Sequence, residues 1–443
     1  MERIPEAVKD VLNRLMSAGH EAWCVGGCVR DLLLGREPDD WDVTTSALPE
    51  ETLALFGERA IPTGLQHGTV TVRTDIGHVE VTTYRTDGSY RDCRHPDSVQ
   101  FTRSLAEDLA RRDFTVNAIA MDISGRVNDP MNGLEDLAAR RLRCVGVPDR
   151  RFGEDALRIL RGLRFASVLE FSVEGETAAS IHRNRELLRM IAAERIRVEL
   201  DKLLCGVGVA EVLGEYPDVL GVFLPEILPA VGFPQNSRYH CYNVWEHTVC
   251  SVAAAPMEPL LRMTMLLHDL GKPACYSVDD NGGGHFYGHN KVSCELAAAI
   301  LNRLKYDNES KRIILTLVER HDWLVNPTEK GIRRALCALG EKELRRLLTV
   351  KRADNLAQSP DYRYRQQEID VLEDLLDDLL AREACFSLKQ LAVNGRDLTA
   401  LGFRGAEIGR ELDRLLLAVV DGVLQNDRDQ LLESAQKQRN SQK

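Results

Sequence analysis

The chain of 443 residues lacks any apolar run long enough to cross a membrane. A spanning helix needs about 18 apolar residues, and the N-terminal MERIPEAVKD also lacks the apolar core of a signal peptide. Internal repeats and low-complexity tracts are missing too. The 11 cysteines are scattered and form no CxxC pair. These absences predict a cytoplasmic protein with reduced thiols and no membrane partner.

An excess of positive charge is also lacking. The chain has 57 Lys and Arg against 68 Asp and Glu, a formal net charge of −11. This argues against non-specific nucleic-acid binding over the whole surface, although it leaves room for a local basic track. The hydrophobic fraction of 44% is that of a globular protein, and the length predicts two to four domains.

A glycine pair follows a short apolar strand, Trp23–Val25, near the N-terminus. Gly26 and Gly27 allow the backbone to turn sharply and to approach a ligand closely. Arg30 then opens a short helical segment over residues 32–34. A turn that leads into the start of a helix is a suitable place to bind a triphosphate.

Two aspartates follow in the sequence DDWDV, which predicts a second strand. Side chains alternate along a strand, so Asp40 and Asp42 point to one side and Trp41 to the other. Neighbouring carboxylates repel each other, and a divalent cation such as Mg2+ relieves the repulsion. Glu80, on a later predicted strand, either completes a carboxylate triad or is a solvated strand residue.

The pattern GG-x-VRD-x-LLG followed by D-x-D resembles the class II nucleotidyltransferases, which are tRNA CCA-adding enzymes and bacterial poly(A) polymerases. The resemblance implies that Asp40 and Asp42 are catalytic and hold Mg2+, with Gly27 and Arg30 on the triphosphate. It also implies an α+β fold. A small mixed β-sheet nucleotidyltransferase head is followed by an all-α neck, an HD domain or body, and a tail.

Residues 68–74 and 78–85 alternate at period two and predict a β-hairpin. The polar, aperiodic residues 85–103 predict a loop beside the site. The next motif, LARRDFTVNAIAMD, alone predicts no more than a charged helix start and a core strand. Its RRD-x-x-x-N pattern matches the family's second motif, which implies ribose recognition by Arg112, Asp113 and Asn117.

The segment 139–164 is rich in arginine, and EDALRILRGLRFA predicts one amphipathic helix. Its polar face alone predicts solvated ion pairs. However, E-D-x-x-R matches the family's template motif, which implies that Asp155 and Arg158 read the Watson–Crick edges of C and A. Arg161 and Arg164 would then hold phosphates or orient that pair.

A second chemical centre is predicted from widely spaced histidines and aspartates. They are His240, His247, His268, Asp269, His289, His321, Asp322 and Asp354. A His-Asp pair ends the apolar segment LLRMTMLLHDLGK, and a buried charged pair needs a partner, usually a metal.

The pattern H…HD…D resembles the HD phosphohydrolase superfamily. The resemblance implies a divalent transition metal and phosphatase or phosphodiesterase activity, with Lys272 on a phosphate. The implied ligands are His247, His268, Asp269 and Asp354, joined by His289 and His321 as in two-metal members.

The motifs predict four parts: a head over 1–138, a neck with base-reading and RNA-binding helices over 139–204, an HD domain over 205–358, and a helical body and tail over 359–443. Composition shifts mark these boundaries, because the chain becomes rich in glycine and then proline after residue 204. Residues from 427 onward are polar and are predicted to be frayed.

The expected function is that of a CCA-adding tRNA nucleotidyltransferase. It would transfer CMP and AMP from CTP and ATP to the tRNA 3′ end without a nucleic-acid template, releasing pyrophosphate. The expected partners are tRNA, ATP and CTP, not DNA, and the oligomeric state is left open. The alternatives are a poly(A) polymerase, an enzyme that adds only A or only CC, an HD phosphohydrolase with an RNA-binding head, and a non-catalytic RNA-binding module. The mixed charge of the C-terminal segment disfavours the poly(A) polymerase.

Overall fold

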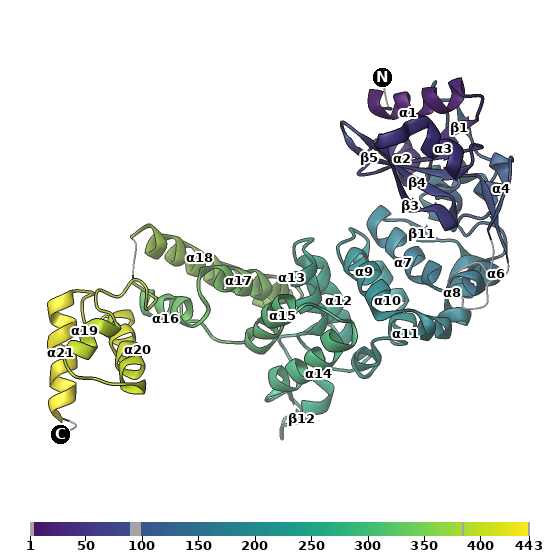
Figure 1. Cartoon of the computed structure of the whole chain (residues 1–443). Helices are drawn as coiled ribbons and strands as arrows, with labels where there is room; N and C mark the ends of the chain where they lie inside the picture. Colours follow the sequence, from purple (N-terminus) through teal and green to yellow (C-terminus); the bar gives the residue numbers. More distant parts are fainter. Residues whose placement is uncertain (1–3, 89–98, 383–384, 442–443) are drawn as a thin grey trace. The chain divides into compact units, whose positions relative to one another are not determined.

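The computed structural model describes residues 4–88, 99–382 and 385–441. It divides into two compact units, Met1–Leu228 and Pro229–Lys443 (Figure 1). The finer division into four domains stays a prediction. Within the described residues, no helix is both long and apolar enough to cross a membrane.

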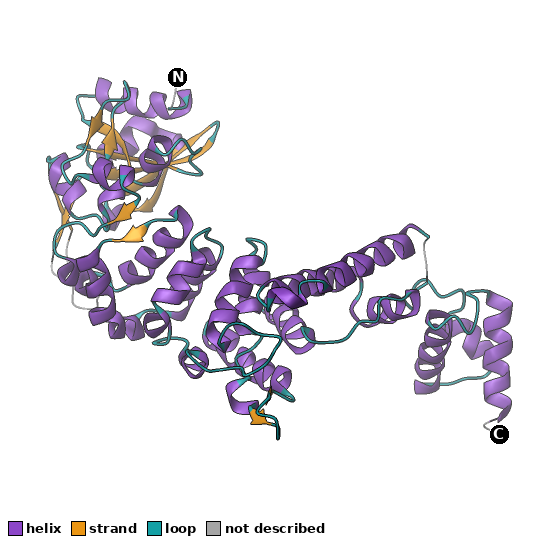
Figure 2. Ribbon diagram, turned by 180° about the vertical axis from the view of Figure 1, so that it is seen from behind, coloured by secondary structure: helices purple, strands orange, loops and turns teal. Residues whose placement is uncertain are grey.

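The first unit begins with a seven-stranded sheet in the order β3-β4-β5-β2-β1-β8-β9 (Figure 2). The sheet is mixed because β2 and β5 pair in parallel, whereas the other neighbours are antiparallel. This arrangement confirms the predicted fold class. The strands are β1 (Ala22–Val25), β2 (Trp41–Thr45), β3 (Ala60–Gly64), β4 (Thr69–Thr74), β5 (Gly77–Thr83), β8 (Ala120–Met121) and β9 (Val127–Asn128).

Short helices accompany this sheet. They are α1 (Glu6–Ser17), α2 (Gly27–Leu33), α3 (Pro49–Phe56), α4 (Leu105–Ala110) and α5 (Gly133–Ala138). The apolar stripe of α1 is buried, because Val8, Val11 and Leu12 have no exposed surface. The predicted hairpin is confirmed by the antiparallel pairing of β4 with β5.

The prediction of a loop over residues 85–103 is wrong at both ends. β6 (Arg85–Asp87) pairs antiparallel with β7 (Val99–Phe101). The two extended ends satisfy each other's backbone hydrogen-bonding groups, which the polar composition does not reveal. Residues 89–98 of the predicted loop lie outside the described residues.

Helices make up most of the remainder of the first unit. They are α6 (Pro148–Glu154), α7 (Leu157–Leu169), α8 (Gly175–Asn184), α9 (Ala193–Leu204), α10 (Val209–Glu215) and α11 (Pro217–Leu220). Two short strands, β10 (Arg141–Leu142) and β11 (Ser172–Val173), pair in parallel among them.

The prediction of one continuous helix through EDALRILRGLRFA is wrong. Helix α6 ends at Glu154, Asp155 has extended backbone angles (φ −137°, ψ 104°), and α7 begins at Leu157. The carboxylate of Asp155 accepts a hydrogen bond from the Leu157 backbone N–H at 3.0 Å. Aspartate commonly makes this local bond in place of the helical one, so the chain breaks here.

The second unit is helical apart from a short hairpin of β12 (Ser277–Val278) and β13 (Gly284–His285). Its larger helices are α12 (Val244–Ala254), α13 (Pro259–Leu267), α14 (His289–Arg303), α15 (Asn308–Arg320), α16 (Glu329–Leu339), α17 (Glu341–Leu356) and α18 (Arg365–Ala381). Asn243 and Glu246 form a capping box at the start of α12. This cap fixes the first turns of the helix that carries His247.

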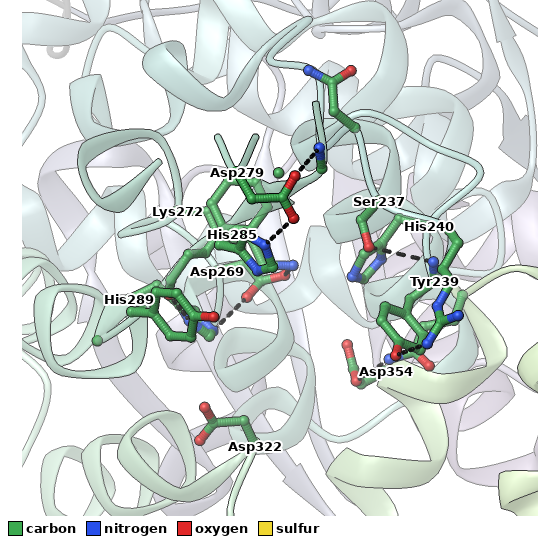
Figure 3. A pocket seen from close by; sticks show the side chains of 18 of the residues that line it. Ser237, Tyr239, His240, Asp269, Lys272, Asp279, His285, His289, Asp322 and Asp354 are labelled. Carbon is green, nitrogen blue, oxygen red and sulfur yellow. Dashed lines mark hydrogen bonds and ion pairs between the residues drawn. The ribbon is translucent and has the colours of Figure 1, made fainter. Parts of the chain in front are cut away.

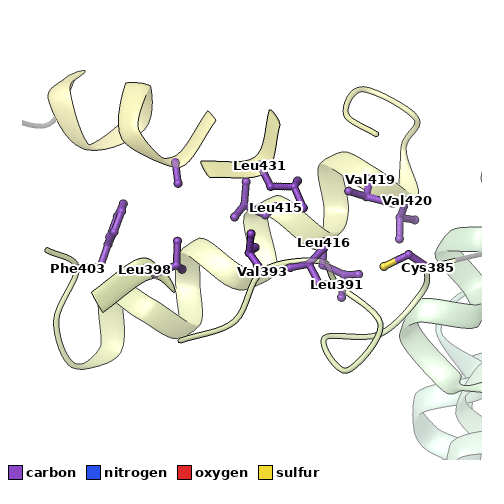
Figure 4. Close-up of a cluster of buried hydrophobic side chains, with 11 residues drawn as sticks. Cys385, Leu391, Val393, Leu398, Phe403, Leu415, Leu416, Val419, Val420 and Leu431 are labelled. Atoms are coloured by element: carbon purple, nitrogen blue, oxygen red, sulfur yellow. The ribbon is translucent and has the colours of Figure 1, made fainter. Parts of the chain in front are cut away.

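The C-terminal segment folds into α19 (Gly395–Ala400), α20 (Ala406–Val420) and α21 (Arg428–Ser441). The prediction of a frayed end after residue 427 is therefore wrong for the described residues. Leu431 and Ala435 of α21 are fully buried in a cluster that includes Leu398, Phe403 and Leu415 (Figure 4). Leu432 packs against the same cluster, so a few apolar residues on one face dock this mostly polar helix.

Replacing Leu431 by Ala should reduce the free energy of unfolding of the tail by about 2–4 kcal/mol, because a buried leucine leaves a cavity. Chemical denaturation followed by hydrogen exchange of α20 and α21 measures the loss. Val423→Ala is the matched control: that side chain is 74% exposed, so its change should stay within about 0.5 kcal/mol. An equal effect of the two substitutions would contradict the docking of α21.

Candidate functional site

Acidic side chains gather where β2 and β5 lie side by side in the head. Asp42 is the second residue of β2, and Asp40 precedes that strand by one position rather than lying within it. In the parallel register Asp42 pairs with Glu80 of β5. Paired residues of neighbouring strands project on the same side of a sheet, so Glu80 shares a face with Asp42. The triad reading of Glu80 is therefore compatible with the fold.

The electrostatic environment of Asp42 disfavours its charged form. Burial raises the pKa of Asp42 to about 6, the Arg112 guanidinium opposes this rise, and the charges of Asp40 and Glu80 add to it. A buried carboxylate that lies among other negative charges is a good ligand for a divalent cation, because the cation supplies the positive charge that the site lacks.

A glycine turn brings a guanidinium to these carboxylates. Gly26 has a φ of +82°, and an added Cβ would lie 3.3 Å from Nη1 of Arg112 and 3.4 Å from Oδ2 of Asp42. A side chain at this position would be strained and would enter the narrow space between the two groups. Nε of Arg112 is buried and has no hydrogen-bond partner in the described part of the chain. Helix α2 begins at Gly27, three residues earlier than predicted.

The other predicted nucleotide-binding residues form a buried network. Arg30 donates to the side-chain oxygen of Asn117 at 2.8 Å, and Asn117 donates to Asp113 at 3.3 Å. Nη2 of Arg161, from α7, lies 2.7 Å from Oδ2 of Asp113. Burial alone would raise the pKa of Asp113, but Arg161 holds it well below its usual range. The head and α7 are thus joined through a permanently charged pair.

Phe165 of α7 organises three guanidinium groups. Those of Arg30, Arg161 and Arg164 lie 5.2, 5.4 and 4.1 Å from the centre of its ring. Cations are attracted to the face of an aromatic ring, so Phe165 holds like charges close together. Nε of Arg164 also lies 3.2 Å from Oε2 of Glu199, on α9.

The predicted base-reading residues have different partners from each other. Arg158 is buried and donates to Glu154 at 2.7 Å and to the backbone carbonyl of Arg151 at 3.2 Å. Asp155 instead lies 3.5 Å from Nη2 of Arg195, on α9. Glu154 therefore holds the Arg158 guanidinium, and Arg195 lies beside the Asp155 carboxylate.

The second unit brings the predicted metal ligands together in two groups. One contains His247, His268, Asp269 and Asp354, and the other contains Asp269, His289 and His321. In the first group, Oδ2 of Asp269 lies 3.3 Å from Nε2 of His247 and 3.2 Å from Nε2 of His268.

Asp269 belongs to both groups. Its Oδ1 lies 3.4 Å from Nε2 of His289 and 3.6 Å from Nε2 of His321. Both carboxylate oxygens are buried, and the described residues provide neither with a hydrogen bond of good geometry. A buried carboxylate that faces two sets of imidazoles has the donor arrangement of a two-metal bridge.

The same kind of contact, between Nδ1 and a backbone carbonyl, orients the rings of all four predicted ligand histidines. The Nδ1 of each approaches a backbone carbonyl, at 3.2 Å for His247, 2.7 Å for His268, 2.8 Å for His289 and 2.7 Å for His321. A proton on Nδ1 donated to the carbonyl leaves the Nε2 lone pair available for a metal. The donor set therefore fits divalent metals, although it does not identify them.

Positively charged groups already lie beside the buried carboxylates of this site. Burial alone would lower the pKa of His268, but Asp269 and Asp354 raise it to about 10. Nζ of Lys272 also lies 2.7 Å from Oδ2 of Asp269. Positive charge is thus already drawn to the buried carboxylates, and metal binding would release a proton.

Three neutral amide side chains form a chain of hydrogen bonds that ends at Asp354. Gln358 donates to Oδ2 of Asp354 at 3.0 Å, and Asn355 donates to Gln358 at 3.1 Å. Gln366 of α18 then donates to Asn355 at 2.7 Å. This amide chain, Gln358–Asn355–Gln366, connects a predicted metal ligand to the next helix.

A cavity of about 700 Å³ opens onto the two ligand groups (Figure 3). His240 lines it together with Lys272 and the rim residues His285 and Tyr287. Burial, Lys272 and His247 lower the pKa of His240 to about 3, which keeps its ring neutral.

The sequence did not single out Phe165 or Gln358, and it placed His240 in the second centre without giving it a role. Phe165 follows Arg161 by four positions within α7, a spacing that places residues on one helical face and was a usable signal. Gln358 lies beyond the end of α17 at Leu356, so helical spacing does not mark it. His240 precedes the first metal ligand by seven residues in a non-helical segment, where no spacing rule marks it.

In metal-free protein, Asp42→Asn should stabilise the fold at high pH. A carboxyl whose folded pKa is raised, here to about 6 from 3.8, loses stabilisation as the pH rises through that range. The variant should therefore gain about 1–3 kcal/mol in the free energy of unfolding at pH 8 and little at pH 4. Denaturant titrations with a chelator measure both. Asp40→Asn, at an exposed position, is the control, and an Asp42→Asn gain independent of pH would contradict the assignment.

Three family models match the chain. The Poly A polymerase head domain matches residues 22–143, the probable RNA and SrmB-binding site of polymerase A matches 170–213, and the HD domain matches 238–359. The first covers the carboxylate face, the glycine turn and Asp113. The third covers all six predicted metal ligands of the second unit.

Curated relatives are CCA-adding enzymes. That of Lactococcus lactis subsp. lactis is 48% identical over 347 residues, 73% of this chain and 86% of the relative. That of Levilactobacillus brevis is 50% identical over 209 residues, 46% of this chain and 52% of the relative. The chain thus matches about half the length of several such relatives and most of the Lactococcus protein.

Solved structures show the same fold. The CCA-adding enzyme of Bacillus stearothermophilus in complex with CTP is 30% identical, with a TM-score of 0.76 over 99% of this chain and 98% of that one. The Thermotoga maritima CCA-adding enzyme complexed with tRNA has a TM-score of 0.59 at 18% identity, over 99% and 97% of the two chains. With these matches and the motifs above, the chain belongs to the family of the CCA-adding enzymes and carries an HD domain.

Proposed function

We propose that the chain is a CCA-adding tRNA nucleotidyltransferase. It would transfer CMP and AMP from CTP and ATP to the 3′ end of tRNA and release pyrophosphate. The observation that carries this proposal is the face where Asp42, its register partner Glu80 and the nearby Arg112 meet at the Gly26 turn. The relatives and the CTP-bound neighbour support the choice of substrates.

The chain's own residues would perform the reaction mainly by positioning. Asp40 and Asp42 hold Mg2+, which when bound neutralises the phosphates and polarises the α-phosphorus. The motif resemblance assigns Arg112 to the ribose, but its guanidinium lies near Asp42 at the Gly26 turn and its buried Nε has no partner among the described residues. We therefore assign Arg112 to the triphosphate instead. The tRNA 3′-hydroxyl then attacks the α-phosphorus in line, and pyrophosphate leaves.

The buried network would hold the sugar and the base. Asp113 and Asn117 are fixed by Arg161 and Arg30, which keeps a carboxylate and an amide ready for ribose hydroxyls. Arg30 is itself engaged inside this network, so its contact with the triphosphate is the weakest of the predicted roles. Asp155 and Arg158 are held by separate partners, which leaves them able to address different atoms of one base.

The HD centre supports a second activity, metal-dependent phosphohydrolysis. The observation that favours it is the bridging position of Asp269 between two imidazole pairs. Imidazole and carboxylate donors suit divalent transition metals, which when bound would activate water and clamp a phosphoester. The substrate of this centre is proposed only as a phosphoester.

The two activities should separate by substitution. Asp42→Ala should reduce nucleotide addition to tRNA lacking CCA by more than about 100-fold, because it removes charge stabilisation. The same variant should still hydrolyse bis-p-nitrophenyl phosphate with Mn2+. Asp269→Asn should do the reverse. Addition should use both CTP and ATP and stop after three nucleotides.

Each activity has its own contradicting result. Long incorporation of A alone would favour a poly(A) polymerase, and CC alone or one A alone would indicate a partial adding enzyme. Addition that persists in Asp42→Ala would show that the head assignment is wrong and would leave the phosphohydrolase with an RNA-binding head.

Base selection should depend on Asp155 and Arg158. Ala at either position should reduce the preference for C and A over U and G by about 10-fold, since one such base contact contributes about 1–3 kcal/mol. Ratios of kcat/KM for the four nucleotides measure it. Arg150→Ala is the control, because this α6 arginine also pairs with Glu154 but its side chain is 79% exposed. Equal losses for all four nucleotides would refute the role.

A further inference from the structure

One histidine of the HD cavity belongs to neither group of metal ligands. His240 lines the cavity with Asp269, His289 and Asp354, yet both ligand groups exclude it. Figure 3 shows His240 on the side of the cavity that carries Ser237 and Tyr239, across from Asp269 and His289. Its ring centre lies 5.0 Å from that of His247, at an interplanar angle of 83°. The ring is therefore next to the centre but outside the ligand set.

The ring of His240 differs from the ligand histidines in its hydrogen bonding. Each ligand histidine has its Nδ1 at a backbone carbonyl. Nδ1 of His240 is buried, and the described residues offer it no partner. A buried polar atom without a partner costs about 1–3 kcal/mol, so such an atom beside a cavity indicates a group reserved for a ligand.

The backbone around His240 is held in place. Its N–H donates to the carbonyl of Ser237 at 3.1 Å, and the N–H of Tyr239 lies 3.3 Å from Oγ of Ser237. This turn directly precedes the capping box of α12. The ring position is thus fixed by the same segment that fixes His247, which is what a contact with a metal-bound group requires.

Arg238, Ser237 and Tyr239 also line the cavity and carry N–H or O–H donors. His240 differs from them because its ring lies next to the predicted ligand His247. Nζ of Lys272 already contacts Asp269 and Gln235, at 2.7 and 2.8 Å. The side chains of Asp279 and Asp322 are acidic and repel a phosphate. A neutral imidazole N–H can donate to a phosphoryl oxygen without competing with metals for the buried carboxylates.

We propose that His240 is a substrate-contacting residue of the HD centre, whose ring donates a hydrogen bond to an oxygen of a phosphoester bound between the two ligand groups. No proton is transferred in this contact. The proposal rests on the phosphohydrolase activity proposed above and adds to it a residue that acts on the phosphoryl group rather than on the metals.

The test uses the full chain loaded with Mn2+. His240→Phe keeps a ring of similar size and removes the donor, and His240→Asn keeps an N–H in a smaller side chain. Inorganic phosphate is the probe, and calorimetry measures its Kd and the Mn2+ stoichiometry. His182→Phe, at a histidine of α8 paired with Asp218, is the control for the same exchange elsewhere.

His240→Phe should bind Mn2+ with unchanged stoichiometry, weaken phosphate binding about 10-fold or more, and lower kcat for bis-p-nitrophenyl phosphate. His240→Asn should recover part of both. Wild-type phosphate affinity in His240→Phe would overturn the proposal while leaving the phosphohydrolase intact, and so would a loss of Mn2+, which indicates a role in metal binding. A wild-type protein that holds Mn2+ but neither binds phosphate nor hydrolyses the ester would overturn both proposals.

Discussion

The ion pair between Asp113 and Arg161 is the interaction on which the nucleotide site depends. It joins the turn after α4 to α7, where Asp113 is buried and the side chain of Arg161 is 34% exposed. Removing Arg161 would leave the buried Asp113 carboxylate without its nearest counter-charge, which lowers the free energy of unfolding. Asn117, Arg30 and Phe165 are arranged around this pair, and the first compact unit therefore includes both parts of the chain.

The two candidate sites differ in the positive groups that offset the negative charge of their carboxylates. In the head, Asp42 lies near the carboxylates of Asp40 and Glu80, and the guanidinium of Arg112 offsets part of their negative charge. In the second unit, imidazoles and Lys272 already balance the buried Asp269 and Asp354. The first arrangement suits a cation that arrives with each nucleotide, whereas the second suits metals that stay bound.

Much of the fold and of the two candidate sites could be predicted from the sequence, because motifs constrain local backbone geometry. The hairpin followed from strand alternation, and the mixed sheet and the meeting of six distant predicted metal ligands followed from resemblance. The break at Asp155 was missed because its carboxylate competes locally with the helix. The docking of α21 was missed because Leu431, Leu432 and Ala435 are too few to mark a polar segment as core. The pairing of Asp155 with Arg195 depends on a tertiary contact with α9 that no spacing encodes.

The amide chain behind Asp354 has a consequence for the HD centre. Gln358, Asn355 and Gln366 carry dipoles but no net charge, so dissolved ions screen them only weakly. Titration in the ordinary range does not alter them either. Asp354, a predicted metal ligand, is therefore connected to α18 by contacts that salt screens less than it screens surface ion pairs such as Arg345 with Asp377. The amide chain should thus keep Asp354 joined to α18 at salt concentrations that weaken the ion pairs between α17 and α18.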